Sequence, residues 1–125
     1  MNAIVLFAGA SGATEGLVRA GVNALVCIDC LQAACIAHRR WHPALDVIRA
    51  RCEDAHAIVN HGAAFDLVWA SPSCKPYSMA NRTPLRGRVH PEWYDLAILA
   101  DQAFGAWRTR WLIVENVCGL LWSKE

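Results

Sequence analysis

Short, continuous apolar runs alternate with stretches of helical periodicity along this chain, and this alternation restricts the folds open to it. The apolar runs cover residues 3–8, 23–28, 45–50, 66–70 and 111–114. Helical patterns cover residues 12–20, 31–41 and 92–107, and residues 53–60 can form a helical turn. Continuous apolar strands separated by helices are typical of a parallel sheet that is covered on both faces. Because crossovers between parallel strands are right-handed, we expect an α/β fold with strand order 3-2-1-4-5.

The composition is that of one globular domain. A chain of 125 residues with 55% hydrophobic content can fill a core of its own. The net charge of +1 gives no overall basic field of the kind that announces nucleic-acid binding, although it leaves room for a local basic patch. No apolar run reaches the roughly 18 residues of a membrane span, and the N-terminus lacks the positive region of a signal peptide. We therefore expect a cytoplasmic protein that makes no membrane contact. We also expect a bacterial or phage-like source, which these features do not decide.

The six cysteines could form three disulfides in a secreted protein, or remain reduced in the cytosol. Four of them lie in or beside apolar or helical stretches, which favours reduced thiols: Cys27, Cys35, Cys52 and Cys118. The pair Cys27 and Cys30, followed by two histidines, superficially resembles a zinc site. The middle spacing is short for a zinc finger and Cys27 lies inside an apolar run, so we expect no metal.

Two helices carry recognisable faces. In the helix 31–41, the core face is expected to consist of Ala34, Ile36 and Ala37, while basic residues suit the negative end of the helix dipole: His38, Arg39 and Arg40. The longer helix 92–107 carries its apolar residues at Leu96, Ile98, Leu99, Ala103 and Phe104.

A glycine-bearing turn follows the first strand. Gly9 and Gly12 allow the backbone to approach a ligand closely, and the helix after them offers free N–H groups. Many nucleotide-binding folds share this feature, so it is a weak signal alone. Asp29 strengthens it, because a carboxylate at the end of the second strand can accept hydrogen bonds from the two hydroxyls of a ribose. The alternative role for Asp29 is to cap the helix that starts near Leu31.

A cysteine and a carboxylate follow the last two predicted strands. Cys74 comes after the run 66–70, and Glu115 comes directly after the run 111–114. In an open α/β sheet, ligands bind at this edge. A thiolate is a strong nucleophile and an acid beside it can protonate what it attacks, so the pair indicates covalent catalysis rather than an inert thiol. The long connection 71–91 is either a solvated loop or a lid that meets an anionic partner.

Taken together, these segments resemble the DNA cytosine-5 methyltransferase family across the whole chain. The turn Phe7-Ala8-Gly9-Ala10-Ser11-Gly12 resembles the first family motif, and Asp29 matches the acid of the second. Asp54 falls where the family keeps the acid that contacts the adenine of its cofactor. The segment Ser71-Pro72-Ser73-Cys74-Lys75-Pro76-Tyr77-Ser78 resembles the catalytic Pro-Cys loop, and Val114-Glu115-Asn116-Val117 is similar to the Glu-Asn-Val motif. The chain departs from the family at Ser11, commonly glycine, at Ser73, normally proline, and at Lys75, usually glutamine.

The resemblance implies a Rossmann-like fold and methyl transfer from S-adenosyl-L-methionine to C5 of a cytosine flipped out of DNA. It implies that Cys74 adds to C6 of the base, that Glu115 contacts N3, and that Asn116 braces the cysteine loop. The expected cofactor-binding residues are Phe7, Gly9, Ala10, Gly12, Asp29, Asp54 and Pro72. The expected DNA contacts, mainly to phosphates, are Lys75, Ser78, Arg82, Arg86 and Arg88.

The chain stops at Glu125, and the family's later motifs and target-recognition region do not occur in it. We therefore expect residues 1–125 to be a partial catalytic domain that methylates DNA poorly by itself. It can be one subunit of a split methyltransferase whose second polypeptide carries target recognition, or an inactive remnant. A dinucleotide-dependent oxidoreductase would share the glycine turn and Asp29, but would need neither Cys74 in its loop nor the pair Glu115 and Asn116.

Overall fold

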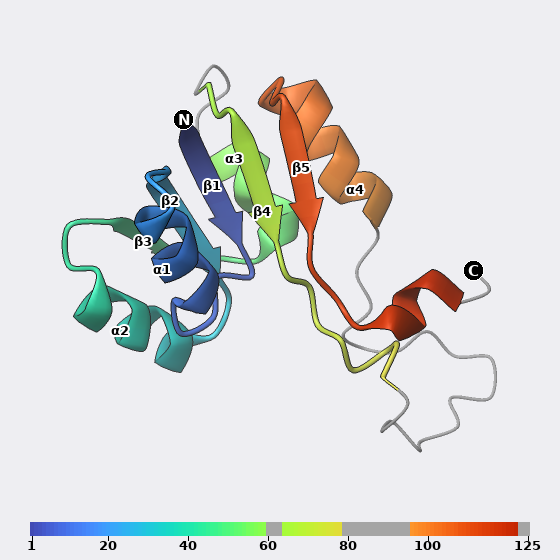
Figure 1. The fold of residues 1–125 in the computed structure, drawn as a ribbon, viewed down its shortest axis with the longest axis horizontal. Coiled ribbons are helices and arrows are strands. Elements are labelled where there is room, and N and C mark those ends of the chain that lie inside the picture. Colours follow the sequence, from blue (N-terminus) through green and yellow to red (C-terminus); the bar gives the residue numbers. More distant parts are fainter. Residues whose placement is uncertain (60–63, 79–95, 123–125) are drawn as a thin grey trace.

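Five parallel strands form one sheet in the order β3-β2-β1-β4-β5 (Figure 1). The computed structural model describes residues 1–59, 64–78 and 96–122. The strands are β1 (Asn2–Leu6), β2 (Asn23–Asp29), β3 (Asp46–Arg49), β4 (Leu67–Ala70) and β5 (Trp111–Val114). The strand order predicted from right-handed crossovers is confirmed. Because all the strands run the same way, their carboxyl ends share one edge of the sheet.

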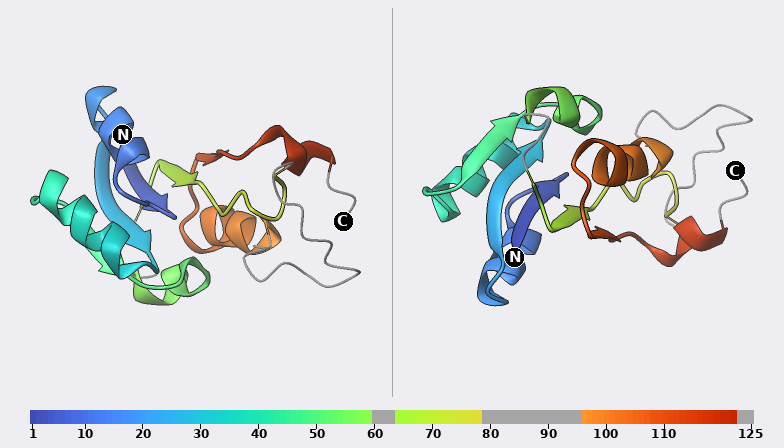
Figure 2. Two further views of the ribbon diagram at one scale, coloured as in Figure 1. Left: turned by 90° about the horizontal axis from the view of Figure 1, so that it is seen from below. Right: turned by 90° about the horizontal axis from the view of Figure 1, so that it is seen from above.

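Helices cover both faces of this sheet (Figures 1 and 2). On one face lie α1 (Gly12–Arg19) and α2 (Gln32–Trp41). On the other lie α3 (Ala55–Ile58), which follows the 3-10 helix Cys52–Asp54, and α4 (Leu96–Ala100), which continues as the π-helix Asp101–Ala106. A 3-10 helix, Cys118–Trp122, follows β5. No helix in the described parts of the chain is long and apolar enough to cross a membrane.

The central strand shows how the sequence builds two cores from one run of apolar residues. Ile4 and Leu6 face α3 and α4, whereas Ala3 and Val5 face α1 and α2. All four side chains are fully buried. This two-sided burial explains why β1 is a continuous apolar run rather than an alternating one.

The expected core face of α2 was wrong. Its buried residues are Cys35 and His38, while Ile36 is 56% exposed. A hydrogen bond from Cys35 Sγ to the Asp29 carbonyl oxygen, 3.4 Å long, joins this buried face of the helix to the end of β2. Hydropathy along the sequence gives no information about such a contact, so the prediction turned the wrong stripe of α2 toward the sheet.

The helix before β5 buries only part of its apolar stripe. Leu99 and Ala103 are fully buried against the sheet, but Ile98 and Phe104 are exposed. The start of the predicted helix at residue 92 lies outside the described residues. The change from α-helix to π-helix at Asp101 alters the rotation per residue, which is the physical reason that one continuous helical stripe does not describe this segment.

The edge strand β5 keeps apolar side chains in solvent. Trp111 is 62% exposed and Ile113 is 42% exposed. These two residues pair with Leu67 and Trp69 of β4, so they lie on the α1 side of the sheet. No helix of the described ranges covers β5 on that side (Figure 2).

Candidate functional site

The turn after β1 is held in an unusual backbone conformation. Phe7, Gly9 and Ser11 all have positive φ angles, of 55°, 55° and 89°. Neighbouring segments hold the turn, because Phe7 N–H donates at 3.3 Å to Sγ of Cys52 in the 3-10 helix, and Ala8 N–H donates at 3.0 Å to the carbonyl of Ile28 in β2. The turn leads directly into α1, so backbone N–H groups gather at this edge of the sheet.

Asp29 connects this turn to α2. One carboxylate oxygen accepts a hydrogen bond from Gly9 N–H at 2.9 Å, and the other accepts from Leu31 N–H at 2.8 Å. The residue is buried, with 8% of its surface exposed. Asp29 is not the N-cap of α2, which is Leu31, but its carboxylate closes the turn before that helix and at the same time holds the glycine turn. Each oxygen keeps a further lone pair for another donor.

The cysteine loop leaves the end of β4 beside this turn. Ser71 N–H donates to the Leu6 carbonyl at 3.4 Å, and its hydroxyl accepts from Trp69 Nε1 at 3.0 Å. Cys74 is exposed, and its carbonyl accepts from Tyr77 N–H at 3.0 Å, which closes a tight turn around the thiol. The loop therefore presents Cys74 to solvent from a backbone that is anchored at both sides of the residue.

The end of β5 is joined to the cysteine loop. Asn116 Nδ2 donates to the Pro72 carbonyl at 3.0 Å, and Asn116 Oδ1 accepts from Val117 N–H at 2.9 Å. Glu115 N–H donates to the Ala70 carbonyl at 2.9 Å and so extends the pairing of β4 with β5 by one residue. The Glu115 side chain is exposed. An acid and a thiol thus stand on two adjacent strand ends that one side chain, Asn116, holds together.

A family model of the C-5 cytosine-specific DNA methylases matches residues 1–125. The chain belongs to the C-5 cytosine-specific DNA methylase family. No curated protein matches the chain by sequence.

Solved structures show the same fold at low identity. Dnmt2 proteins from Spodoptera frugiperda (15% identity, TM-score 0.74) and S. pombe (19% identity, TM-score 0.64) match 98% and 99% of this chain. A prophage-encoded DNA modification methyltransferase from E. coli matches 97% of it, with 19% identity and a TM-score of 0.68. The chain spans only about a third of these proteins, covering 37%, 36% and 33% of their lengths.

Two buried thiols of this methylase domain are poor nucleophiles. Burial raises the pKa of Cys52 to about 12, although the hydrogen bond from Phe7 N–H works in the other direction. Burial also raises the pKa of Cys27, which lies 3.6 Å from the Thr14 hydroxyl. Both thiols therefore stay protonated at neutral pH. The exposed cysteines are Cys30, Cys74 and Cys118, and of these Cys74 lies in the loop that leaves β4.

The structure describes some of the other expected site residues and not the rest. Asp54 is exposed in the 3-10 helix that follows β3, while Lys75 and Ser78 belong to the cysteine loop. Arg82, Arg86 and Arg88 lie outside the described residues. No group of three side chains suited to a metal ion occurs within residues 1–59, 64–78 and 96–122.

Two residues near the site were not predicted. Gly119 lies against the backbone of Tyr77, and His38 is fully buried on α2. A glycine at the start of a 3-10 helix carries no sequence signal for a contact made with a distant loop. For His38, the spacing of three from Cys35 was a usable signal, because the two share one helix face.

Proposed function

We propose that this chain is the nucleophile- and cofactor-bearing part of a DNA cytosine-5 methyltransferase. The observation that carries the proposal is the hydrogen bond from Asn116 Nδ2 to the Pro72 carbonyl. It joins the strand end that bears Glu115 to the loop that bears Cys74, so the two chemical groups required for attack on cytosine belong to one braced unit. Membership of the methylase family supports the same assignment.

The turn after β1 fits S-adenosyl-L-methionine. A Cβ added at Gly9 would meet no atom within 4 Å, so the backbone there is open to a ligand. Asp29 has lone pairs left to accept from a ribose. The cofactor would supply the methyl group. We propose that it is held by Phe7, Gly9, Ala10, Gly12, Asp29, Asp54 and Pro72.

The proposed roles of the chain's own residues follow from the reactivity of cytosine. C5 of cytosine is a weak nucleophile within an aromatic ring, and addition of the Cys74 thiolate at C6 makes C5 enamine-like. Glu115 would contact N3 and stabilise the adduct. Expulsion of Cys74, after C5 has been methylated and its proton lost, restores the ring. The base must leave the duplex to reach this edge, and contacts to phosphates from Lys75, Ser78, Arg82, Arg86 and Arg88 would hold the strand.

We propose further that target recognition comes from sequence beyond these residues, and that a second polypeptide is one way to supply it. The chain spans about a third of its structural relatives. The exposed apolar pair Trp111 and Ile113 on β5 is a surface of the kind that another segment would cover. The competing assignment, an inactive remnant, keeps the fold but transfers no methyl group.

Transfer of labelled methyl groups to DNA tests the proposal. The samples are the chain alone, the chain mixed with a separately supplied polypeptide that carries the remaining family motifs, and the same mixture with Cys74→Ser. We expect very low transfer by the chain alone, restored transfer by the mixture, and none with Cys74→Ser. Transfer that survives Cys74→Ser contradicts the mechanism, and robust transfer by the chain alone contradicts the need for further sequence.

A covalent trap detects the same chemistry when turnover is slow. In an oligonucleotide with 5-fluorocytosine, C5 carries fluorine in place of the proton, so the elimination that frees Cys74 after methylation is blocked. The adduct then accumulates, and its mass and position can be measured. We expect it on Cys74 in the presence of S-adenosyl-L-methionine.

A further inference from the structure

Gln102 is a buried amide near the start of the π-helix that precedes β5. The residue is 2% exposed, and its carbonyl accepts from Trp107 N–H at 3.0 Å, a bond between residues five apart. Such π turns are rare and occur frequently at functional sites. A polar side chain in an apolar core needs partners there, and Gln102 finds them in the 3-10 helix Cys52–Asp54, on the same face of the sheet.

The amide of Gln102 ties this 3-10 helix by two hydrogen bonds. Gln102 Nε2 donates to the Cys52 carbonyl and to the Glu53 carbonyl, at 2.9 Å in both cases. An amide nitrogen carries two hydrogens, so both are used. The same nitrogen lies 3.4 Å from His56 Nδ1 in α3. The opposite orientation of the amide would set its oxygen against two carbonyl oxygens, so the two bonds determine which way the group points.

The 3-10 helix connects this amide to the turn after β1. At its first residue, Cys52 Sγ accepts from Phe7 N–H at 3.3 Å. At its last residue, Asp54 is exposed. The second carbonyl that Gln102 holds is that of Glu53, directly before Asp54. Loss of the Gln102 amide would therefore remove a tie from the Asp54 end of the helix, while the Cys52 end keeps its bond to Phe7.

We propose that Gln102 is a positioning residue of the cofactor site, which holds Asp54 where its carboxylate accepts a hydrogen bond from the adenine of S-adenosyl-L-methionine. The inference rests on the proposed function, in which Asp54 is one of the cofactor-binding residues. Gln102 is buried and both hydrogens of its amide are used, so it acts through the backbone of Glu53 and not by touching the cofactor. Adenine offers a carboxylate one exocyclic donor, the N6 amino group, so this contact can be measured by changing the ligand.

Calorimetric titration with two ligands tests this role. S-adenosylhomocysteine carries the N6 amino group, whereas S-inosylhomocysteine has an oxygen in its place, which would repel a carboxylate. We expect the native chain to bind the first roughly 10- to 100-fold more tightly than the second. In Gln102→Met, which keeps the length of the side chain and removes both donors, we expect this ratio to fall roughly three- to tenfold. Gln102→Asn keeps the amide on a shorter side chain and should lie between the two.

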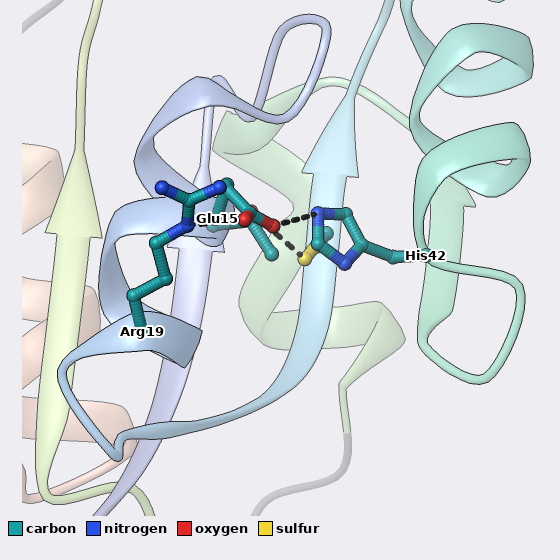
Figure 3. A network of polar contacts seen from close by, with 5 residues as sticks. Glu15, Arg19 and His42 are labelled. Atoms are coloured by element: carbon teal, nitrogen blue, oxygen red, sulfur yellow. Dashed lines mark hydrogen bonds and ion pairs between the residues drawn. The ribbon is translucent and has the colours of Figure 1, made fainter.

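Two control variants change polar contacts that do not involve the 3-10 helix. Thr109→Val removes the buried hydrogen bond from Thr109 Oγ1 to the Ala103 carbonyl, 3.0 Å long, just beyond the same π-helix. Glu15→Gln changes the contact of Glu15 Oε2 with His42 Nε2, 3.5 Å long, which joins α1 to the end of α2 on the other face of the sheet (Figure 3). We expect both controls to keep the native ratio of affinities, whatever stability they lose.

The ratio separates positioning from a purely structural role, because a loss of stability does not change it among folded molecules. A Gln102→Met chain that keeps the native ratio overturns the inference and leaves the proposed function intact. Failure of both Gln102 variants to fold, while Thr109→Val folds, also overturns it, since Gln102 would then be a structural residue. A native chain that does not distinguish the ligands overturns the inference together with the role of Asp54, and one that binds neither overturns the cofactor assignment as well.

Discussion

Gly119 lies so close to the Tyr77 carbonyl oxygen that no residue with a side chain fits at position 119. A Cβ at position 119 would lie 2.0 Å from that oxygen and 3.1 Å from the carbonyl carbon. Both atoms belong to the backbone, so no side-chain rotation relieves the clash. Since Tyr77 N–H donates to the Cys74 carbonyl, the 3-10 helix after β5 packs directly against the turn that carries Cys74.

Gly119→Ala should therefore displace Cys74 without touching it. We expect the rate of adduct formation with 5-fluorocytosine DNA to fall roughly 10- to 100-fold, because small misplacements of a reacting group are costly. Stability should fall by about 1–3 kcal/mol. Gly16→Ala is the matched control, since a Cβ at Gly16 in α1 meets no atom within 4 Å. An unchanged rate in Gly119→Ala would show that the 3-10 helix does not position the loop.

Ser11 occupies a backbone conformation that favours glycine. Its φ is 89° and its side chain makes no capping hydrogen bond to α1. A left-handed conformation costs an L-residue about 1–2 kcal/mol, whereas glycine adopts it freely but loses more chain entropy. We expect Ser11→Gly to raise the free energy of unfolding by about 0.5–1 kcal/mol in urea titrations. The reverse test is Gly9→Ala, which should destabilise the protein because Gly9 has a φ of 55°. If both variants were as stable as the native chain, the strain argument would be refuted.

The lowered pKa of His38 predicts a loss of stability in mild acid. Its ordinary value is 6.5, and burial is the main cause of the shift. The unfolded chain binds a proton at that value and the folded chain does so only at lower pH, so stability is lost as pH falls from about 7 toward the folded pKa. The charged or titratable groups around the ring are Asp29 and His42, with Glu15 behind His42.

We expect His38→Phe to flatten this part of the pH profile. Urea unfolding at several pH values between about 5 and 8 measures the slope, which should be smaller in the variant than in the native chain. His42→Asn is the control, because it removes the neighbouring imidazole but keeps His38. A slope that disappears in His42→Asn and persists in His38→Phe would contradict the account, because the pH dependence would then belong to His42.

Asp29 should matter for both the cofactor and the fold. Asp29→Ala removes the acceptors of Gly9 N–H and Leu31 N–H together with two proposed hydrogen bonds to ribose. Charge-assisted hydrogen bonds contribute roughly 1.5–3 kcal/mol each, so calorimetry should show a large loss of affinity for S-adenosyl-L-methionine. Equal affinity in the native and substituted chains would mean that Asp29 is only a structural cap.

The fold could be predicted from local patterns in the sequence, whereas the contacts that shape the site could not. Apolar runs such as the one around Ile4 identify buried strands, and the handedness of crossovers then fixes their order. Cys74 and Glu115 could be placed at one sheet edge for the same reason. The rotation of α2 could not, because its buried stripe packs against β2 and β3, and these contacts are made with other parts of the chain. The clash that makes Gly119 necessary likewise depends on a residue far along the chain.

Covalent trapping by 5-fluorocytosine tests the central claim most directly. The chain is incubated with S-adenosyl-L-methionine and a single-stranded oligonucleotide that contains the modified base, and the products are mapped by mass spectrometry. The account predicts one adduct, on Cys74, that accumulates slowly and is absent from Cys74→Ser. An adduct on Cys30 or Cys118, an adduct that persists in Cys74→Ser, or the absence of any adduct after prolonged incubation would contradict it.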